Sequence, residues 1–405
     1  MEPRETYQPE LTAGTKHSSA ASALLAGGAI ALIVKVFLAL NTYGTNDVLF
    51  YEGYIETAKE RGAIALYQIG AELSDGTTAY HREPFWTPPF VVSYLLSIDR
   101  LASATDLSFR AWLRILSAIA DSLSLFVLYR LVPIPASSAW LISLSPPAIL
   151  ITGFHGSTDA LLVCFLLTSV LLLERHERAV WGGVFFGLSC AVKVWPIVFA
   201  PCLLLYLNGW RRRAYFMIAA CTIWLASGLP HIVIDPRSIL SQIVGYRGVD
   251  MVWGIRYFAK LLFPAFDSWL GAYGAVAIAI ASIIAGIWLS RLRLALHARV
   301  GFLALAFLVV TPAFGYQYLL WLTPALILFF PYELAVYGVL AGCFLSVTYY
   351  SFSDINWLAN TVSKSPSMVG LILEVFTWMY LARIAARLSN GLLSQSSSGE
   401  QVANS

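Results

Sequence analysis

The chain has 405 residues, of which 58% are hydrophobic and only 12% are charged, a composition that excludes a soluble globular protein and predicts an all-α integral membrane protein. The formal net charge of +3 is small, and no long basic tract with interleaved aromatic residues occurs, so nucleic acid is not expected as a partner. The five cysteines are scattered and lack CxxC spacing, which argues against a disulfide framework and a metal site.

Apolar runs divide the chain into many helices. Residues 1–20 are predicted to be a cytoplasmic tail, residues 21–390 a single multi-span transmembrane domain of about 12 helices, and the Ser-rich end, 391–405, a disordered tail. The runs begin near Leu24, Trp112, Ser138, Leu161, Trp181, Val194, Ala214, Leu270, Gly301, Leu319, Leu334 and Val369. The two runs beside Lys193 are short for a bilayer about 30 Å thick, so we expect them to meet at a polar pocket.

Arginines set the expected orientation of the spans, because Lys and Arg favour the cytoplasmic side. With a cytoplasmic N-terminus, residues 42–108 and 235–269 become the two large outer loops. The arginines that then lie inside are Arg130, Arg175, Arg178, Arg211, Arg212, Arg213, Arg291, Arg293, Arg299, Arg383 and Arg387. Short loops and the lack of a retention signal favour a prokaryotic plasma membrane, and we expect a monomer.

The segment Phe85–Leu101 allows two interpretations. It is apolar enough to be a span, which would change the side of the membrane on which Asp159 lies, or it is an amphipathic helix within the first outer loop. Several prolines crowd its start, and Arg100 would stand without a partner at the far end of a span. We therefore favour the amphipathic helix.

The segment Asn41–Gly53 follows the first apolar run and contains Asp47, the first acidic residue after that run. Residues Val48–Lys59 have the pattern of a short amphipathic helix, which places Asp47 at the helix N-terminus, where the helix dipole stabilises an acid. On the predicted topology Asp47 stands at the outer membrane edge, with Asn46 and Glu52 beside it.

Charged residues interrupt the apolar runs at Lys35, Asp121, Asp159 and Lys193. A charge at the centre of a span costs about 2.5 to 3.5 kcal/mol on insertion scales, so each of these must face a partner or a cavity. Lys35 is either a structural cation, snorkelling or paired with Asp121, or a ligand for a phosphate. Asp121 is expected to be structural, because a helix centre offers no route for a ligand.

The other two charges also allow two interpretations each. Asp159 is either the N-cap of the next helix or, with His155, part of the polar wall of a site. Lys193 precedes Pro196, which breaks the helix, so its cation either satisfies free carbonyls or binds a phosphate. Gln317 is expected to hydrogen-bond a polar ligand.

Aromatic residues mark two further regions. The outer loop 235–269 mixes aromatic and cationic side chains, including Arg247, Arg256 and Tyr257, and this mixture suits a ligand at the membrane interface. Trp321 is expected to belong to an interfacial aromatic belt.

Four segments, taken in order, resemble the C-type (GT-C) glycosyltransferases, which use polyprenyl-phosphate sugars, and most closely family 87 and the GPI-type mannosyltransferases. They are TNDVLFYEGY (45–54), SPPAILITGFHGSTDALLVCFLL (145–167), GLSCAVKVWPIVFAPCLLLYL (187–207) and TPAFGYQYLLWLTPALIL (311–328). Some family 87 members have a histidine before the last of these helices, whereas this chain has Phe314, Gly315 and Tyr316 there.

The resemblance implies a GT-C fold whose large first outer loop bears the catalytic acid, which maps onto Asp47. We expect an inverting transfer of a sugar, mannose by resemblance, from a polyprenyl-phosphate donor to a hydroxyl of a lipid-linked or glycan acceptor outside the membrane. This reaction scheme requires neither a cofactor nor a metal. The expected donor-binding residues are Lys35, Asn46, His155, Asp159, Lys193, Arg247, Arg256, Tyr257 and Gln317. The expected acceptor contacts are Glu52, His81, Arg82 and Tyr316. The alternative is a transporter or flippase, whose pathway the same charges would line.

Overall fold

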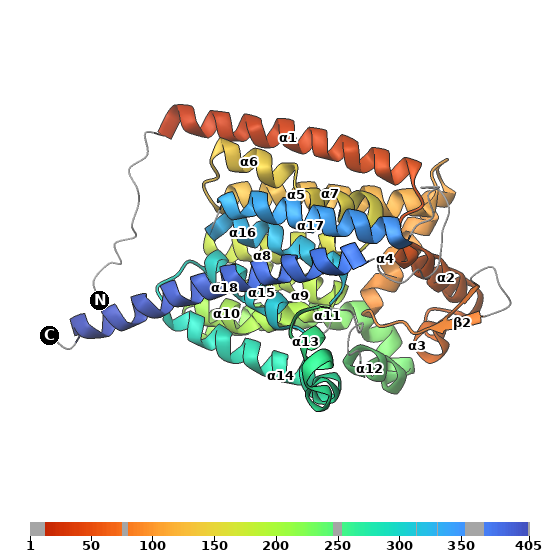
Figure 1. The fold of residues 1–405 in the computed structure, drawn as a ribbon. Coiled ribbons are helices and arrows are strands. Elements are labelled where there is room, and N and C mark those ends of the chain that lie inside the picture. Colours follow the sequence, from red (N-terminus) through yellow and green to blue (C-terminus); the bar gives the residue numbers. More distant parts are fainter. Residues whose placement is uncertain are drawn as a thin grey trace.

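The computed structural model describes residues 13–74, 80–245, 253–312, 314–329, 331–352 and 368–403, and all structural statements concern these residues. The long helices lie side by side in an elongated bundle (Figure 1). Helix α1 (Ala13–Asn41) begins, and α18 (Met368–Ala403) ends, at the same end of this bundle. At the opposite end, here called the loop end, lie α2 (Asn46–Arg61), α3 (Ala65–Ile69) and α12 (Pro236–Gly245).

The remaining helices differ in length. The longer ones are α5 (Phe109–Leu131), α11 (Trp210–Ile234), α14 (Pro264–Arg291) and α17 (Pro331–Phe352). The shorter ones are α4 (Pro89–Ser103), α6 (Ala136–Ser143), α7 (Pro146–Ile149), α8 (Asp159–Glu174), α9 (Ala179–Val192), α10 (Ala200–Tyr206), α13 (Gly254–Leu262), α15 (Leu296–Val310) and α16 (Leu322–Phe329).

The multi-span helical prediction is confirmed. Within the described ranges, seven helical segments are long and apolar enough to cross a membrane, namely Ser19–Asn41, Phe109–Leu131, Ala136–His155, Trp210–Ile234, Pro264–Arg291, Tyr332–Tyr350 and Met368–Leu392. Three shorter apolar helices accompany them. The expected number of about 12 helices is not confirmed, because several apolar runs form helices too short to span a bilayer.

Glycines allow α9 and α11 to pack with their backbones in contact. A Cβ atom at Gly183 would lie 2.2 Å from the carbonyl oxygen of Phe216, and one at Gly187 would lie 2.6 Å from that of Ala220. Small residues four apart bring helices together in this way within membranes, where van der Waals contact replaces the hydrophobic effect. This contact holds the middle of the bundle together.

The segment after α1 folds into a small unit with its own apolar core at the loop end. Phe85 is completely buried there, and the rings of Tyr54 and Tyr67 meet its ring edge-on at centroid distances of 4.8 and 5.2 Å. Helix α4 joins this core and has 15 residues, too few to be counted among the candidate spans. Its position in the membrane interface stays a prediction.

The same unit contains a hairpin that the all-α prediction did not include. Strands β1 (Ala71–Ser74) and β2 (Tyr80–Glu83) pair antiparallel. His81 and Arg82 lie on β2, with their backbones opposite Leu73 and Glu72. The positions of these two residues in the hairpin do not test whether they contact an acceptor, so that contact stays a prediction.

Irregular helical turns interrupt the bundle where the sequence has its polar motifs. The π-helical turn η1 (Leu150–His155) ends at His155, and the 3₁₀ turns η2 (Trp195–Phe199) and η3 (Tyr316–Trp321) follow Lys193 and Gly315. Turns η1 and η3 contact each other. Irregular backbone within a membrane protein is tolerated where protein surrounds it, and π-turns often mark functional sites.

Candidate active site

The carboxylate of Asp47 meets the imidazole of His155 at the loop end of the bundle. Asp47 lies in the first turn of α2, and its Oδ2 atom is 2.9 Å from Nε2 of His155. The Asp47 side chain remains 27% exposed, whereas the His155 side chain is only 4% exposed. Because no hydrogen bond within the described ranges engages Oδ1 of Asp47, this oxygen can accept a proton from a ligand.

The loop between α1 and α2 is fixed by a buried arginine. Arg114 of α5 is 1% exposed and donates to the carbonyl oxygens of Ala39 (2.8 Å) and Thr42 (2.6 Å) at the C-terminal end of α1. A cation is favoured there, because the last carbonyls of a helix lack intrahelical donors. On the other side, the Thr45 hydroxyl donates to the carbonyl oxygen of His155 at 3.0 Å. These bonds set the position of α2 relative to η1.

A second charged group surrounds Asp159, which is completely buried. Its Oδ2 accepts from Nζ of Lys193 at 2.7 Å, and its Oδ1 accepts from Nε1 of Trp321 at 2.9 Å. The Lys193 ammonium also lies 5.2 Å from the centroid of the Tyr318 ring, a cation–π distance. The residue before α8 is Thr158, so the N-cap interpretation of Asp159 is wrong and the polar-wall interpretation is supported.

The Asp47–His155 pair and the Lys193–Asp159 pair interact electrostatically. Burial raises the pKa of Asp47, but the charge and hydrogen bond of His155, with the charge of Lys193, outweigh burial and hold that pKa below its ordinary value. Burial and then the charge of Asp47 raise the pKa of Tyr51, one turn along α2, well above its ordinary range. At neutral pH, Asp47 is therefore ionised and Tyr51 is neutral.

Two tyrosines extend the site towards the C-terminal helices. The ring of Tyr349 on α17 lies 5.5 Å from that of His155, and the ring of Tyr316 lies 6.4 Å from that of Tyr349, both measured between centroids. Tyr316, an expected acceptor contact, is therefore part of the group around Asp47.

Lys35 is not part of this group. Its ammonium is completely buried and ion-pairs with the carboxylate of Asp121 on α5. A buried cation is stable only beside an opposite charge, and this carboxylate supplies it. The structural interpretation of Lys35 is therefore supported, and its role at a donor phosphate stays a prediction.

Glu52 and Arg256 also have protein partners. Both carboxylate oxygens of Glu52 accept from Arg110, at 2.6 and 2.7 Å, in a bidentate pair that ties α2 to α5. The expected contact of Glu52 with an acceptor stays a prediction. Nε of Arg256 donates to Asp267 of α14 at 3.0 Å, which leaves its phosphate-binding role a prediction.

The other candidates have less defined surroundings. Asn46 is exposed at the start of α2, and Tyr257 is half-buried with its ring against Phe258. The Gln317 side chain is half-buried and folds over Gly315, where a Cβ would lie 2.8 Å from its Oε1. Arg247 lies outside the described residues.

The structure also gives Trp321 a role that sequence reasoning missed. The aromatic-belt interpretation is wrong, since Trp321 is 6% exposed and its indole N–H bonds to Asp159. In the sequence, only the position of Trp321 within the TPAFGYQYLLWLTP segment suggested a functional role. The residues next to Trp321 do not indicate a contact with Asp159, which lies 162 positions away.

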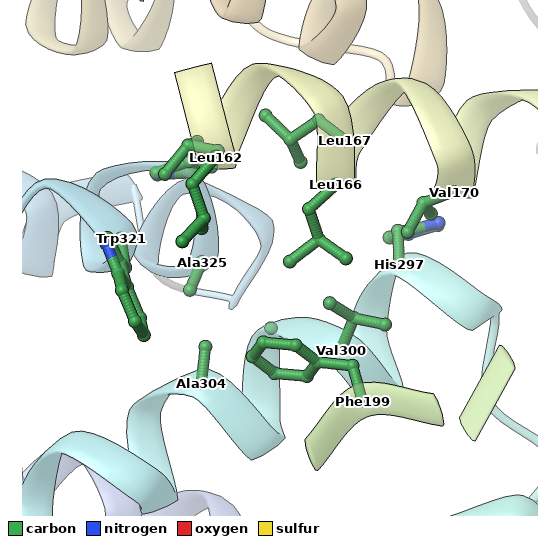
Figure 2. Close-up of a pocket in the computed structure, with 13 residues that line it drawn as sticks. Leu162, Leu166, Leu167, Val170, Phe199, His297, Val300, Ala304, Trp321 and Ala325 are labelled. Atoms are coloured by element: carbon green, nitrogen blue, oxygen red, sulfur yellow. The ribbon is translucent and has the colours of Figure 1, made fainter. Parts of the chain in front are cut away.

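An apolar cavity of about 40 Å³ lies beside Trp321. Figure 2 shows Trp321 and Leu162 at one end of it and Val170 and His297 at the other. The cavity therefore extends along α8, away from Asp159. Its wall is mostly apolar and could contact a hydrocarbon chain. Among the described residues, no group of three or more His, Cys, Asp or Glu side chains could hold a metal ion, and the expected absence of a metal stays a prediction.

This arrangement of helices is the fold of the C-type glycosyltransferases. The structure is similar to the crystal structure of ArnT from Cupriavidus metallidurans bound to undecaprenyl phosphate, with a TM-score of 0.51 and 13% sequence identity, over 95% of this chain and 80% of that one. The GT-C resemblance is thus confirmed for the fold, while a specific relation to family 87 is not tested.

The sequence comparisons are narrower and concern the middle of the chain. Residues 153–262 match the family model described as Mannosyltransferase (PIG-M). The chain is also similar to GPI mannosyltransferase 1 of Candida albicans (24% identity over 98 residues, 24% of each chain) and of Kluyveromyces lactis (31% identity over 71 residues, 18% of this chain and 17% of that one). The similarity thus spans about a quarter or less of the length of these relatives. His155, Asp159 and Lys193 fall within the matched segment, and Asp47 falls outside it.

Proposed function

We propose that the chain is an inverting glycosyltransferase that moves mannose from a polyprenyl-phosphate donor to a hydroxyl of a lipid-linked or glycan acceptor. The observation that carries this proposal is the carboxylate of Asp47. Its Oδ2 is bonded to His155, and its side chain is partly exposed near the ion pair between Lys193 and the buried Asp159. The GT-C fold, the similarity to GPI mannosyltransferase 1 and the undecaprenyl phosphate bound to ArnT support the reaction class and the donor.

In this mechanism Asp47 acts as the general base. Its Oδ1 takes the proton of the acceptor hydroxyl while the hydroxyl oxygen forms a bond to the anomeric carbon. The bond from that carbon to the phosphate oxygen breaks on the opposite face, and the phosphate leaves with the electron pair, so the anomeric centre is inverted. General-base assistance is typically worth about 10²- to 10⁴-fold in rate, and a carboxylate also stabilises positive charge on the sugar.

Lys193 is the cation we assign to the donor phosphate. Its ammonium donates to Asp159 at 2.7 Å, and an ammonium can donate to several acceptors at once. Its side chain is 14% exposed, and a charge-assisted bond to the phosphate strengthens as the leaving group gains charge. We retain Asn46, Arg247, Arg256, Tyr257 and Gln317 as proposed donor contacts.

The cavity beside Trp321 supports a hydrophobic donor. Its volume accommodates only a small part of a prenyl chain, so most of the chain would lie against the lipid face of the bundle. We place the reaction on the extracytoplasmic side, because Asp47 lies at the loop end, opposite the arginine-rich ends of the helices. The curated relatives are eukaryotic proteins, so they do not support the expectation of a prokaryotic plasma membrane.

The test is radiolabel transfer by purified protein in detergent with polyprenyl-phosphate mannose. Asp47→Asn is nearly isosteric and should lower the transfer rate about 10²- to 10⁴-fold, whereas Asp106→Asn, an exposed acid before α5, should leave it unchanged. Full activity of a folded Asp47→Asn protein would remove Asp47 from the base role. A wild-type protein that forms no glycosidic bond in detergent would instead favour the transporter.

A further inference from the structure

The last spanning helix carries a buried acid that the mechanism above does not use. On α18, the side facing the bundle consists of Gly370, Glu374, Thr377, Leu381 and Ile384, all buried, at the spacing of one helix face. Glu374 is 5% exposed and lies within the span Met368–Leu392. An acid on the inward face of a membrane helix marks a functional site unless the protein satisfies it.

At least one carboxyl oxygen of this acid lacks a hydrogen bond within the described part of the chain. Oε1 of Glu374 is buried and has no hydrogen-bond partner among the described residues. Most buried polar side-chain atoms are hydrogen-bonded, so this oxygen is available to accept a hydrogen bond from a ligand. A carboxyl can accept a hydrogen bond from a hydroxyl, and it disfavours a phosphate because both are acidic.

Glu374 lies on α18, which packs against α15 and α17. Trp378, one turn further along α18, donates its indole N–H to the Val309 carbonyl oxygen at 2.9 Å and so fixes α18 against the outer end of α15. Burial raises the pKa of Tyr316, and the charge of Glu374 raises it further, so the two groups interact electrostatically. Tyr316 in turn reaches His155 through Tyr349.

We propose that Glu374 is a specificity-determining residue that binds a sugar hydroxyl of one of the two substrates, across the Tyr316–Tyr349 pair from Asp47. This proposal rests on the proposed function. The hydroxyl belongs either to the transferred sugar or to the acceptor glycan, and the effect of a substitution on the two KM values distinguishes these sources.

The experiment measures kcat and both KM values for three variants. Glu374→Leu removes the hydrogen bond and should raise the KM for one substrate by about tenfold while the KM for the other stays within twofold. Glu374→Asp keeps the carboxyl but withdraws it by one methylene, so it should raise the same KM. Glu333→Gln, a change of the acid that pairs with Arg387 between α17 and α18, is the control and should leave both KM values unchanged.

Unchanged KM values for both substrates in Glu374→Asp, or in folded Glu374→Leu, would overturn the proposal. A parallel rise of both KM values would also overturn it, since that indicates a general distortion of the site. If Glu374→Leu does not fold, Glu374→Asp decides. Failure of the wild-type protein to transfer sugar would refute the proposed function itself, which separates the two outcomes.

Discussion

Substitutions in the buried pair Lys35–Asp121 test whether Lys35 stabilises the fold or acts on the substrate. It links α1 to α5, with Lys35 0% and the Asp121 side chain 9% exposed, so neither charge can be solvated alone. Lys35→Met removes the cation and leaves the carboxylate buried without a partner, which costs about 3 to 5 kcal/mol in comparable cases. Replacing both residues, as Lys35→Met with Asp121→Leu, fills the same space with apolar groups and should restore or exceed the original stability.

The assay is heat-induced unfolding of the detergent-purified proteins, followed by the radiolabel transfer assay on each. The single variant should unfold at a lower temperature, and the double variant should unfold close to the wild type and transfer sugar at a similar rate. A stable but inactive double variant would show that Lys35 acts on the substrate. A single variant as stable as the wild type would refute the reasoning about the buried charge.

Two further predictions concern the active site and the bundle. His155→Ala removes the hydrogen bond and charge that lower the pKa of Asp47, so the acid limb of the kcat/KM profile should move to higher pH, and an unmoved limb would contradict the assignment of His155. The lowered pKa of Asp47 also stabilises the folded protein at pH values above the pKa that Asp47 has in the unfolded chain. This contribution to stability should be lost as the pH falls through the pKa that Asp47 has in the folded protein. Gly187→Ala should destabilise by about 1 to 3 kcal/mol through its contact with Ala220. Gly28→Ala on α1, where a Cβ meets nothing within 4 Å, is its control, and equal stability of the two would contradict the packing argument.

Glu374 shows how a functional candidate escapes sequence reasoning. It is an isolated acid within the last apolar run, and no neighbouring residue in the sequence distinguishes it from an acid at a helix end. Its significance comes from its place on the buried side of α18 and from its electrostatic interaction with Tyr316. Both depend on how α18 is rotated against the rest of the bundle, and packing sets that rotation.

The positions of the spans and the placement of Asp47 at the start of α2 followed from the sequence, because apolar runs and helix-start patterns are local properties of the chain. The break at Lys193 followed in the same way from Pro196.

Only the tertiary structure decided which charges meet. Lys35 and Asp121 are 86 positions apart, Asp47 and His155 are 108 apart, and Asp159 and Trp321 are 162 apart. A buried charge needs a partner within a few ångströms, but composition and periodicity do not carry distances between remote segments. The sequence therefore predicted that the charges within the apolar runs need a partner or a cavity, and the packing of the helices selected each partner.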